Sequence, residues 1–295
     1  MDVIGERAAF ADACAAARSR GAAVGVVPTM GALHDGHRAL LERARGADDF
    51  VAMTLFVNPL QFGDTADLRS YPGRRDDDLA AAEAAGCDVV FAPTAGEMYP
   101  RGDPEVAVDP GPLGARLEGA ARPGHFRGVL TVVAKLLSLA GPCRAYFGEK
   151  DAQQLELVRR MVRDLDVPAE IVACPTVRAP DGLALASRNA RLTPAEREAA
   201  PVLFRALSAG VFVIGAGERS AGLVRTQIAD VLAAEPLART NYVAVIDEET
   251  WDEVGTVPDR ARLLVAAWIG DVRLIDGVAV RSASASIPAS GERAE

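Results

Sequence analysis

The sequence predicts an α/β protein, with a Rossmann-like parallel-sheet domain followed by a smaller C-terminal α+β domain. Over roughly the first 175 residues, short apolar runs alternate with runs of helical period. Strands that alternate with helices need crossover connections, and such connections make a sheet parallel. Beyond this point the order changes to helices followed by strands. We therefore expect one domain over 1–176 and a second over 177–295.

Each element follows from its local pattern. In the first domain, runs rich in β-branched residues predict strands, and apolar residues spaced three or four apart predict the helices between them. The strands are expected at 22–28, 50–57, 88–92, 145–148 and 171–173, and the helices at 34–45, 75–85, 126–140 and 152–166. In the second domain we expect helices at 194–208 and 221–234, strands at 242–247, 263–269 and 272–275, and a loose tail from about 282.

Composition excludes several classes of protein. The chain has 295 residues, of which 49% are hydrophobic, and a net charge of −9. This acidic balance argues against a nucleic-acid-binding protein, which needs a basic face. The most apolar stretch, 129–140, is too short to span a bilayer. With no signal peptide recognisable and four scattered cysteines, we expect a cytoplasmic protein that binds neither membrane nor nucleic acid.

The segment 27–37, VPTMGALHDGH, is the most informative part of the chain, because it follows a predicted strand and opens a predicted helix. Backbone N–H groups and the helix dipole favour an anion at such a position. Gly31 and Gly36 allow close approach of the backbone to a ligand. His34 and His37 are three residues apart, so they share one face of a helical turn. Taken alone, this histidine pair could equally be structural, but its context favours an anion site.

Ordered sequence blocks then reveal a resemblance. HDGH at 34–37 resembles the HxGH signature of the nucleotidyltransferase superfamily, which includes class I aminoacyl-tRNA synthetases. The longer string PTMGALHDGH at 28–37 resembles the signature of the pantothenate synthetase (pantoate–β-alanine ligase) family. Further matching blocks follow in order: TLFVNPLQFG at 54–63, DDDL at 76–79, GHFRGVLTVVAKLL at 124–137, FGEKDAQQ at 147–154 and PTVRAPDGLALASRN at 175–189.

The resemblance implies a two-step reaction. The carboxylate of pantoate attacks the α-phosphorus of ATP, pyrophosphate leaves, and pantoyl adenylate forms. The amine of β-alanine then attacks the activated carbonyl and displaces AMP. An enzyme of this kind positions its substrates and stabilises charge on phosphate oxygens. It needs no covalent nucleophile, and no motif for one is evident in the sequence.

The resemblance also implies the residues of an ATP site. His34 and His37 are expected to donate to phosphate oxygens, with His37 as the candidate acid. Lys150 is expected to hold the phosphates as a point charge. Arg188 is expected to reach them from the second domain, on a loop that acts as a lid. The full expected set is Met30, Gly31, His34, Gly36, His37, Gly148, Lys150, Asp151, Val177, Ser187 and Arg188.

Substrate and metal sites are implied as well. Gln61 and Gln154 match the pantoate-binding glutamines of the family, since neutral amides can bind both hydroxyls and a carboxylate. Asn58 is a further substrate-binding candidate, although an Asn before a proline is also a common turn residue. Asp77 and Asp78 are the candidate Mg²⁺ ligands, directly or through water, the alternative being a solvated acidic face. The second domain resembles a lid and dimerisation domain, so we expect a homodimer.

Two positions depart from the family pattern. Ala152 stands where GEKDYQQ has an aromatic residue, and Ala186 stands where MSSRN has its first serine. The loss of that hydroxyl removes one potential phosphate donor. The alternatives for function are a plain adenylyltransferase, an aminoacyl-tRNA synthetase, which the short acidic chain without a KMSKS string disfavours, and a non-catalytic nucleotide-binding module.

Overall fold

The computed structural model describes residues 1–63, 68 and 73–281. The chain divides into two compact units, Met1–Cys174 and Pro175–Glu295, and each is described by itself. The predicted loose tail from 282 lies outside the described residues.

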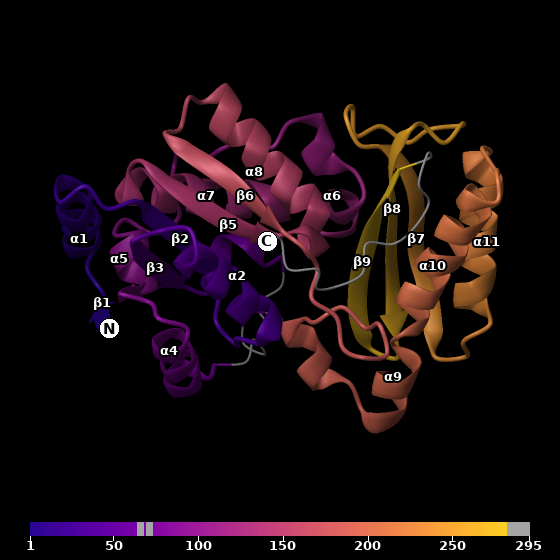
Figure 1. The fold of residues 1–295 in the computed structure, drawn as a ribbon, viewed down its shortest axis with the longest axis horizontal. Coiled ribbons are helices and arrows are strands. Elements are labelled where there is room, and N and C mark those ends of the chain that lie inside the picture. The colour runs from indigo at the N-terminus through magenta and orange to yellow at the C-terminus, as the bar shows by residue number, and fades with distance from the viewer. Residues whose placement is uncertain (64–67, 69–72, 282–295) are drawn as a thin grey trace. The chain divides into compact units, whose positions relative to one another are not determined.

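The first unit is built on a six-stranded sheet in the order β1-β4-β3-β2-β5-β6 (Figure 1). Every neighbouring pair in it is parallel, as the alternation of strand and helix predicts. The α/β fold class is thereby confirmed. The strands are β1 (Asp2–Ile4), β2 (Val24–Thr29), β3 (Phe50–Leu55), β4 (Val89–Phe91), β5 (Cys143–Gly148) and β6 (Ala169–Cys174).

Helices cover both faces of this sheet. Val27 and Met53 pack with Leu41 of α2 on one face. On strand β4, Phe91 stacks on Phe10 of α1 with ring centroids 4.6 Å apart. Successive strand residues point to opposite faces, so α1 covers the face opposite α2. The helices are α1 (Arg7–Ser19), α2 (Asp35–Arg45), α4 (Arg75–Ala84), α5 (Ala95–Met98), α6 (Glu118–Ala121), α7 (His125–Ala140) and α8 (Ala152–Asp164), with short 3-10 turns η1 (Pro59–Gln61), η2 (Pro112–Ala115) and η3 (Glu149–Asp151).

The strand order changes direction at β2. From β2 the chain moves outward through β3 and β4, and it later returns to place β5 on the other side of β2. Strands β2 and β3 pair along six residues, from Val24↔Phe50 to Thr29↔Leu55. Between β2 and β5 the register contains only Gly25↔Arg144 and Val26↔Ala145. The two strands therefore part toward their carboxyl ends, which is where ligands bind in open parallel sheets.

The second unit has an antiparallel sheet in the order β7-β8-β9, with α10 packed against α11, β8 and β9. Its elements are η4 (Ser187–Arg191), α9 (Pro194–Ala199), α10 (Val202–Gly215), α11 (Ala221–Ala233), β7 (Ala238–Asp247), β8 (Arg260–Ile269) and β9 (Val272–Arg281). Strand β9 runs past the predicted 272–275 because Asp276 and Gly277, which look like turn residues, have other roles: Asp276 binds Arg178. A Cβ on Gly277 would lie 2.7 Å from Leu264 Cδ2, so a larger residue there would displace this side chain.

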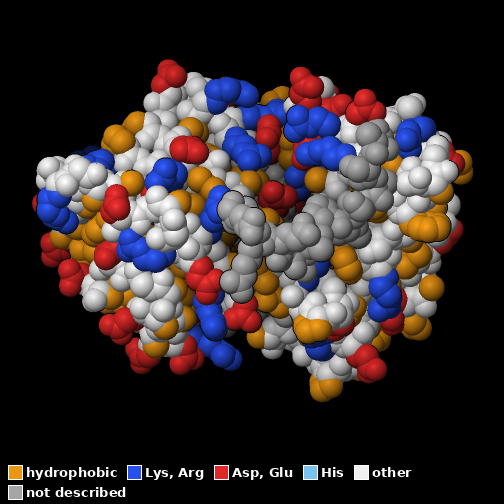
Figure 2. Space-filling view, in the orientation of Figure 1, with side chains coloured by type: hydrophobic (Ala, Val, Ile, Leu, Met, Phe, Trp, Pro, Cys, Tyr) orange, Lys and Arg blue, Asp and Glu red, His pale blue; other side chains and the backbone are white. Residues whose placement is uncertain are grey.

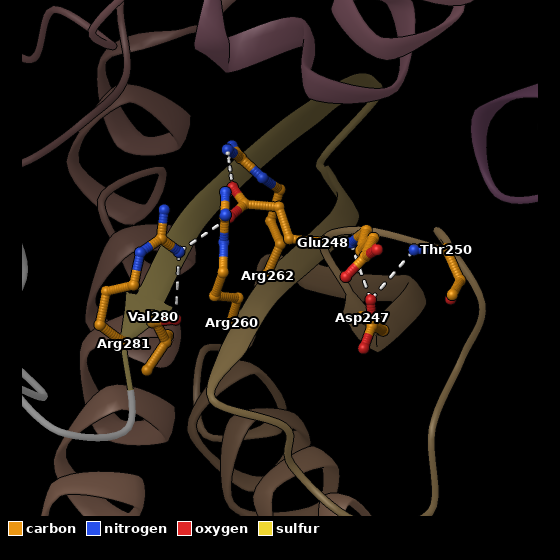
Figure 3. A network of polar contacts seen from close by, with 8 residues as sticks. Asp247, Glu248, Thr250, Arg260, Arg262, Val280 and Arg281 are labelled. Atoms are coloured by element: carbon orange, nitrogen blue, oxygen red, sulfur yellow. Dashed lines mark hydrogen bonds and ion pairs between the residues drawn. The ribbon is translucent and has the colours of Figure 1, made fainter.

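A carboxylate ties the three strands of this sheet together (Figure 3). Glu248, next to the end of β7, accepts from Arg262 of β8 at 2.9 Å and from Arg281 of β9 at 2.8 Å. Arg260 lies 3.4 Å from the same carboxylate. Burial alone would raise the pKa of Glu248, but the hydrogen bonds and charges of Arg262 and Arg281 outweigh it and lower the pKa. Glu248 therefore stays ionised and fixes the sheet edge.

The stretch Pro194–Gly215 is long and apolar enough to cross a membrane by length and composition alone. It is 56% buried, and Val202, Leu207 and Ile214 within it belong to the core of the second unit. A core helix of a folded unit passes the same test, so this stretch carries no argument for a membrane protein. On the face drawn in Figure 2, acidic and basic side chains are interspersed.

Four elements were not predicted: β1, α1, α5 and α6. The strand β1 and the helices α5 and α6 are only three or four residues long, and α1 is rich in alanine, so none has a strong apolar period. The single helix predicted at 194–208 is two helices, α9 and α10.

Candidate functional site

The loop between β2 and α2 has an unusual backbone conformation at residues 31 and 32. Gly31 and Ala32 have φ angles of +89° and +52°, and Ala32, which has a Cβ, pays a backbone cost for this unless its surroundings hold it. A Cβ on Gly31 would lie 2.8 Å from both Asp78 Oδ2 and Leu55 Cδ1. Glycine is therefore required at position 31 for its conformation and for space.

The carboxylate of Asp78 holds this loop in place. Asp78 lies in the first turn of α4 and is 2% exposed. Its Oδ2 accepts the Ala32 N–H at 2.9 Å, and its Oδ1 accepts the Leu33 N–H at 2.7 Å. Both oxygens thus bind the backbone directly before His34.

The structure gives Asp77 and Asp78, the predicted Mg²⁺ ligands, different surroundings, and their metal role stays a prediction. Asp77 is exposed, whereas its neighbour is buried and already bonded to the loop. Among the described residues no group of three or more His, Cys, Asp or Glu side chains could hold a metal ion. The DDDL run looked like a cluster in sequence, but successive helical residues point about 100° apart and do not converge.

The two histidines cap α2 with their own rings. His34 is the N-cap residue, and its Nδ1 accepts the Gly36 N–H at 3.1 Å. The Nδ1 of His37 accepts the His34 N–H at 3.4 Å. An imidazole nitrogen that accepts from a backbone N–H carries no proton, so each neutral ring has its proton on Nε2. The rings lie together, with centroids 4.2 Å apart, and both present an Nε2–H donor.

Both rings stay neutral at physiological pH. Burial lowers the pKa of His34 to about 4, and the charge of Lys150 lowers it further. Burial, followed by the neighbouring His34, lowers the pKa of His37 to about 3. The role of His37 as an acid stays a prediction, and in this geometry both rings are hydrogen-bond donors through Nε2.

The end of β5 brings a cation to the same place. Lys150 lies in η3, directly after β5, and its charge acts on both imidazoles. Its Nζ is 3.7 Å from Asp151 Oδ1, and its side chain is 18% exposed. The chain has two lysines, Lys135 and Lys150, and many arginines. A lysine ammonium is a more compact point charge than a guanidinium, which suits it to hold phosphate. Beside Lys150, a Cβ on Gly148 would meet no described atom within 4 Å, which leaves room there for a ligand.

Gln61 and Asn58 both follow β3, but their side chains have different roles. Gln61 is 7% exposed, and its Nε2 lies 2.7 Å from the Sδ of Met30 in the loop before His34. Asn58 is 1% exposed, and both ends of its amide are hydrogen-bonded within the protein. Asn58 is thus placed as a support of Gln61, and the geometry does not favour it as a substrate ligand.

In helix α8 the structure distinguishes two adjacent glutamines. Gln153 is buried, where it accepts the Glu118 N–H and donates to the carbonyls of Leu113 and Arg116. Gln154 is partly exposed in the first turn of α8, next in sequence to the anchored residue. Ala152, which replaces the family's aromatic residue, is 4% exposed, so a bulky side chain there would need more room than this packing offers.

The remaining predicted residues, Val177, Ser187 and Arg188, belong to the second unit. Their loop is anchored at its base by Arg178, whose Nη1 and Nη2 bind the buried Asp276 at 2.6 and 2.9 Å. Arg178 also lies over the ring of Phe204, 4.2 Å from its centroid. Ala186 is the N-cap residue of η4 and makes no side-chain capping hydrogen bond. The serine that the family has at this position could supply one.

Several supports of the site have no signal in the local sequence. His125 binds the Gln61 carbonyl through Nδ1 at 2.9 Å and faces Arg122 through Nε2 at 3.0 Å. Since a carbonyl only accepts and a guanidinium only donates, His125 carries its proton on Nδ1. The partners of Arg178 and Asp78 lie 98 and 46 residues away in sequence, so no local signal could have identified them.

The first unit is thus a nucleotide-binding α/β fold, with neutral imidazole donors and a lysine at the carboxyl ends of adjacent strands. The model of the pantoate-beta-alanine ligase family matches residues 2–279. Pantothenate synthetase of Roseiflexus sp. (strain RS-1) is 55% identical over 252 residues, which cover 85% of this chain and 90% of the relative. The chain therefore belongs to the pantoate-beta-alanine ligase family.

Solved structures agree with this assignment. The crystal structure of pantothenate synthetase from Thermus thermophilus is 48% identical with a TM-score of 0.88, covering 94% of this chain and 99% of that one. Pantoate-beta-alanine ligase from Francisella tularensis, complexed with beta-gamma ATP and beta-alanine, is 32% identical with a TM-score of 0.75. It is matched over 97% of this chain and 100% of its own length.

The histidine geometry can be tested by NMR, because the chain has only 3 histidines. We expect long-range ¹H–¹⁵N spectra to show His34 and His37 as Nε2–H tautomers and His125 as the opposite, Nδ1–H tautomer. All three rings should remain neutral from pH 8 to about 5, since burial lowers the pKa of each to about 4 or below. Assignment comes from the single variants His34→Gln, His37→Gln and His125→Gln. A His34 or His37 ring that titrates near pH 6.5 would contradict the assigned hydrogen bonds.

The role of Asp78 can be separated from metal binding with its neighbour as control. Asp78→Asn leaves one acceptor for two backbone N–H groups and turns an NH₂ toward one of them. We expect it to lower the free energy of unfolding by about 2–4 kcal/mol and to reduce kcat/KM for ATP. Asp77→Asn, which changes an exposed side chain, should alter neither quantity. If Asp78→Asn kept full stability and only raised the Mg²⁺ concentration needed for activity, the metal role would stand instead.

Proposed function

We propose that the protein condenses pantoate with β-alanine in an ATP-dependent reaction that passes through pantoyl adenylate and releases pyrophosphate and AMP. The observation that carries this proposal is the meeting of two neutral Nε2–H donors with Lys150 where β2 and β5 part. Family membership supplies the substrate class.

In the first step, a carboxylate oxygen of pantoate forms a bond to the α-phosphorus of ATP. The bond from that phosphorus to the bridging oxygen breaks, and pyrophosphate leaves with the electron pair. His34 and His37 donate to the phosphate oxygens on which charge grows, and Lys150 offsets that charge. Neutral donors suit this task, because they bind an oxyanion without transferring a proton to it.

In the second step, the amine nitrogen of β-alanine bonds to the carbonyl carbon of the adenylate. The bond from this carbon to the AMP oxygen then breaks, and the amine loses a proton. The part of the enzyme is again to hold the reacting groups together, since the adenylate already has a good leaving group. Gln61 and Gln154 are proposed to hold pantoate through its oxygens, while Met30, Gly31, Gly36, Gly148 and Asp151 are proposed to line the nucleotide.

The second unit is proposed to complete the site and the assembly. Val177 is proposed to meet the adenine, and Ser187 and Arg188 to meet the phosphates, from a lid loop in a domain that also forms a homodimer. Mg²⁺ is proposed to enter with ATP as its counterion, because the described carboxylates do not fit a protein-held metal centre. We further propose a cytoplasmic location.

A plain adenylyltransferase shares the HxGH motif, but it makes no amide bond. Pyrophosphate exchange that depends on pantoate, followed by AMP release that depends on β-alanine, supports the ligase. Exchange with a phosphate-bearing acceptor and no response to β-alanine would support the adenylyltransferase.

Removal of the charge at position 150 is the most direct test of the mechanism. We expect Lys150→Ala to lower kcat by about 10²–10³, the scale for losing one donor to a developing oxyanion. Lys150→Arg keeps the charge but changes its shape, so it should recover only part of the rate. His37→Ala should lose rate on the same scale as Lys150→Ala.

Arg163→Ala provides a matched control, because this arginine is 70% exposed on α8 and pairs with the adjacent Asp164 at 2.8 Å. It should leave both kcat and the KM for ATP unchanged. A folded Lys150→Ala variant with wild-type turnover would overturn the proposed mechanism.

A further inference from the structure

The amide of Asn58 has a fixed orientation. Its Nδ2 donates to the Gly128 carbonyl at 3.1 Å, and its Oδ1 receives the Leu60 N–H at 3.4 Å. A carbonyl can only accept and a backbone N–H can only donate, so turning the amide over would set like against like at both contacts. The close approach depends on Gly128, where a Cβ would lie 2.2 Å from the Leu60 carbonyl oxygen.

This orientation decides the direction of two further hydrogen bonds. The Tyr99 hydroxyl lies 2.9 Å from Asn58 Oδ1, and it must donate, because that oxygen only accepts. The second hydrogen of Asn58 Nδ2 points to Gln61 Oε1 at 3.2 Å. Gln61 therefore has its oxygen turned toward Asn58 and its NH₂ turned toward Met30 and the loop before His34.

The backbone of Gln61 is fixed as well. His125, which is 7% exposed, donates from Nδ1 to the Gln61 carbonyl. With the backbone held and Oε1 turned toward Asn58, the polar group that Gln61 turns toward the loop before His34 is its NH₂, an N–H donor. Such a donor suits the carboxylate and hydroxyl oxygens of pantoate, whereas an amide oxygen in its place would repel the carboxylate.

We propose that Tyr99 is a positioning residue for pantoate, whose hydroxyl adds a hydrogen bond that stiffens Asn58 in this orientation and so strengthens its hold on Gln61, the NH₂ end of which faces the substrate. This inference rests on the proposed function, since it takes pantoate as the ligand of Gln61. Tyr99 itself does not touch the reacting atoms in this scheme. It lies directly after α5 and reaches Asn58 across 41 residues of sequence.

The surroundings of Tyr99 make its hydroxyl separable from its ring. The ring is 7% exposed and packs near Phe56 with centroids 6.1 Å apart, and Lys135 Nζ lies 5.7 Å from its centroid. Tyr99→Phe keeps these contacts and removes only the donor. Burial raises the pKa of Tyr99 to about 12, so the hydroxyl retains its proton throughout the range of an assay.

The test is steady-state kinetics of Tyr99→Phe with each substrate varied in turn. We expect the KM for pantoate to rise about three- to tenfold, the effect of one buried hydrogen bond, while the KM for ATP and kcat change less than about twofold. Tyr146→Phe is the matched control. Tyr146 is also buried, but its hydroxyl binds Asp48, which precedes β3 at the amino end of the sheet, so all three constants should stay near wild type.

A double variant separates positioning from general destabilisation. Gln61→Ala should raise the KM for pantoate, and adding Tyr99→Phe to it should raise that KM no further, because Tyr99 acts on pantoate only through Gln61. Additive effects of the two substitutions, an equal rise of the KM for ATP, or an unchanged KM for pantoate in Tyr99→Phe would each overturn the proposal.

Gln61→Glu tests the same claim without altering Tyr99. It replaces the NH₂ by an acceptor oxygen, so the KM for pantoate should rise more than in Gln61→Ala. Pantoate binding at wild-type strength in Gln61→Glu would show that Gln61 does not act as a donor. Failure of the proposed function is recognised separately, because the wild-type enzyme would then form no pantothenate from pantoate, ATP and β-alanine.

Discussion

The adjacency of β2 and β5 in one parallel sheet is the constraint on which the rest of the site depends. Both strands end at the same edge, so the residues that follow them meet although more than a hundred positions separate them in the chain. The histidines come from the end of one strand and Lys150 from the end of the other. Crossover helices on both faces keep this edge in register, because each strand is packed on both sides.

Around this edge, buried polar groups fall into two kinds. Asp78, Asn58 and His125 direct their hydrogen-bonding capacity to the protein, where they fix a loop, an amide and a carbonyl. His34 uses Nδ1 for the protein and keeps an Nε2–H donor, while Gln61 turns its oxygen to Asn58 and has one N–H on Met30, which leaves its second N–H as a donor. This division follows from the cost of an unpaired buried polar group, which makes fully bonded side chains good supports and partly bonded ones good binders. The same side-chain types appear in both kinds, so residue type alone does not separate them.

For the same reason, the sequence predicts the fold better than it predicts the roles of single side chains. The alternation of apolar runs identified the parallel sheet, and the position of 27–37 between a strand and a helix placed the histidines at its edge. Residue type suggested Asp78 as a metal ligand and Asn58 as a substrate ligand, but it did not show that Asp78 binds the loop backbone or that Asn58 binds the Gly128 carbonyl. The direction of a buried side chain depends on partners far away in sequence, such as Tyr99 for Asn58, and a local pattern does not contain them.

The short ladder between β2 and β5 has a consequence for stability. After Val26↔Ala145 no further pair joins these strands in the described register, so the sheet is least bonded along the line that leads into the site. A molecule bound there supplies contacts to both halves of the sheet that the chain does not make for itself. Because it binds only the folded form, it adds to the free energy of unfolding in proportion to the logarithm of its concentration. If the proposed nucleotide site lies there, ATP stabilises the sheet as well as taking part in the chemistry.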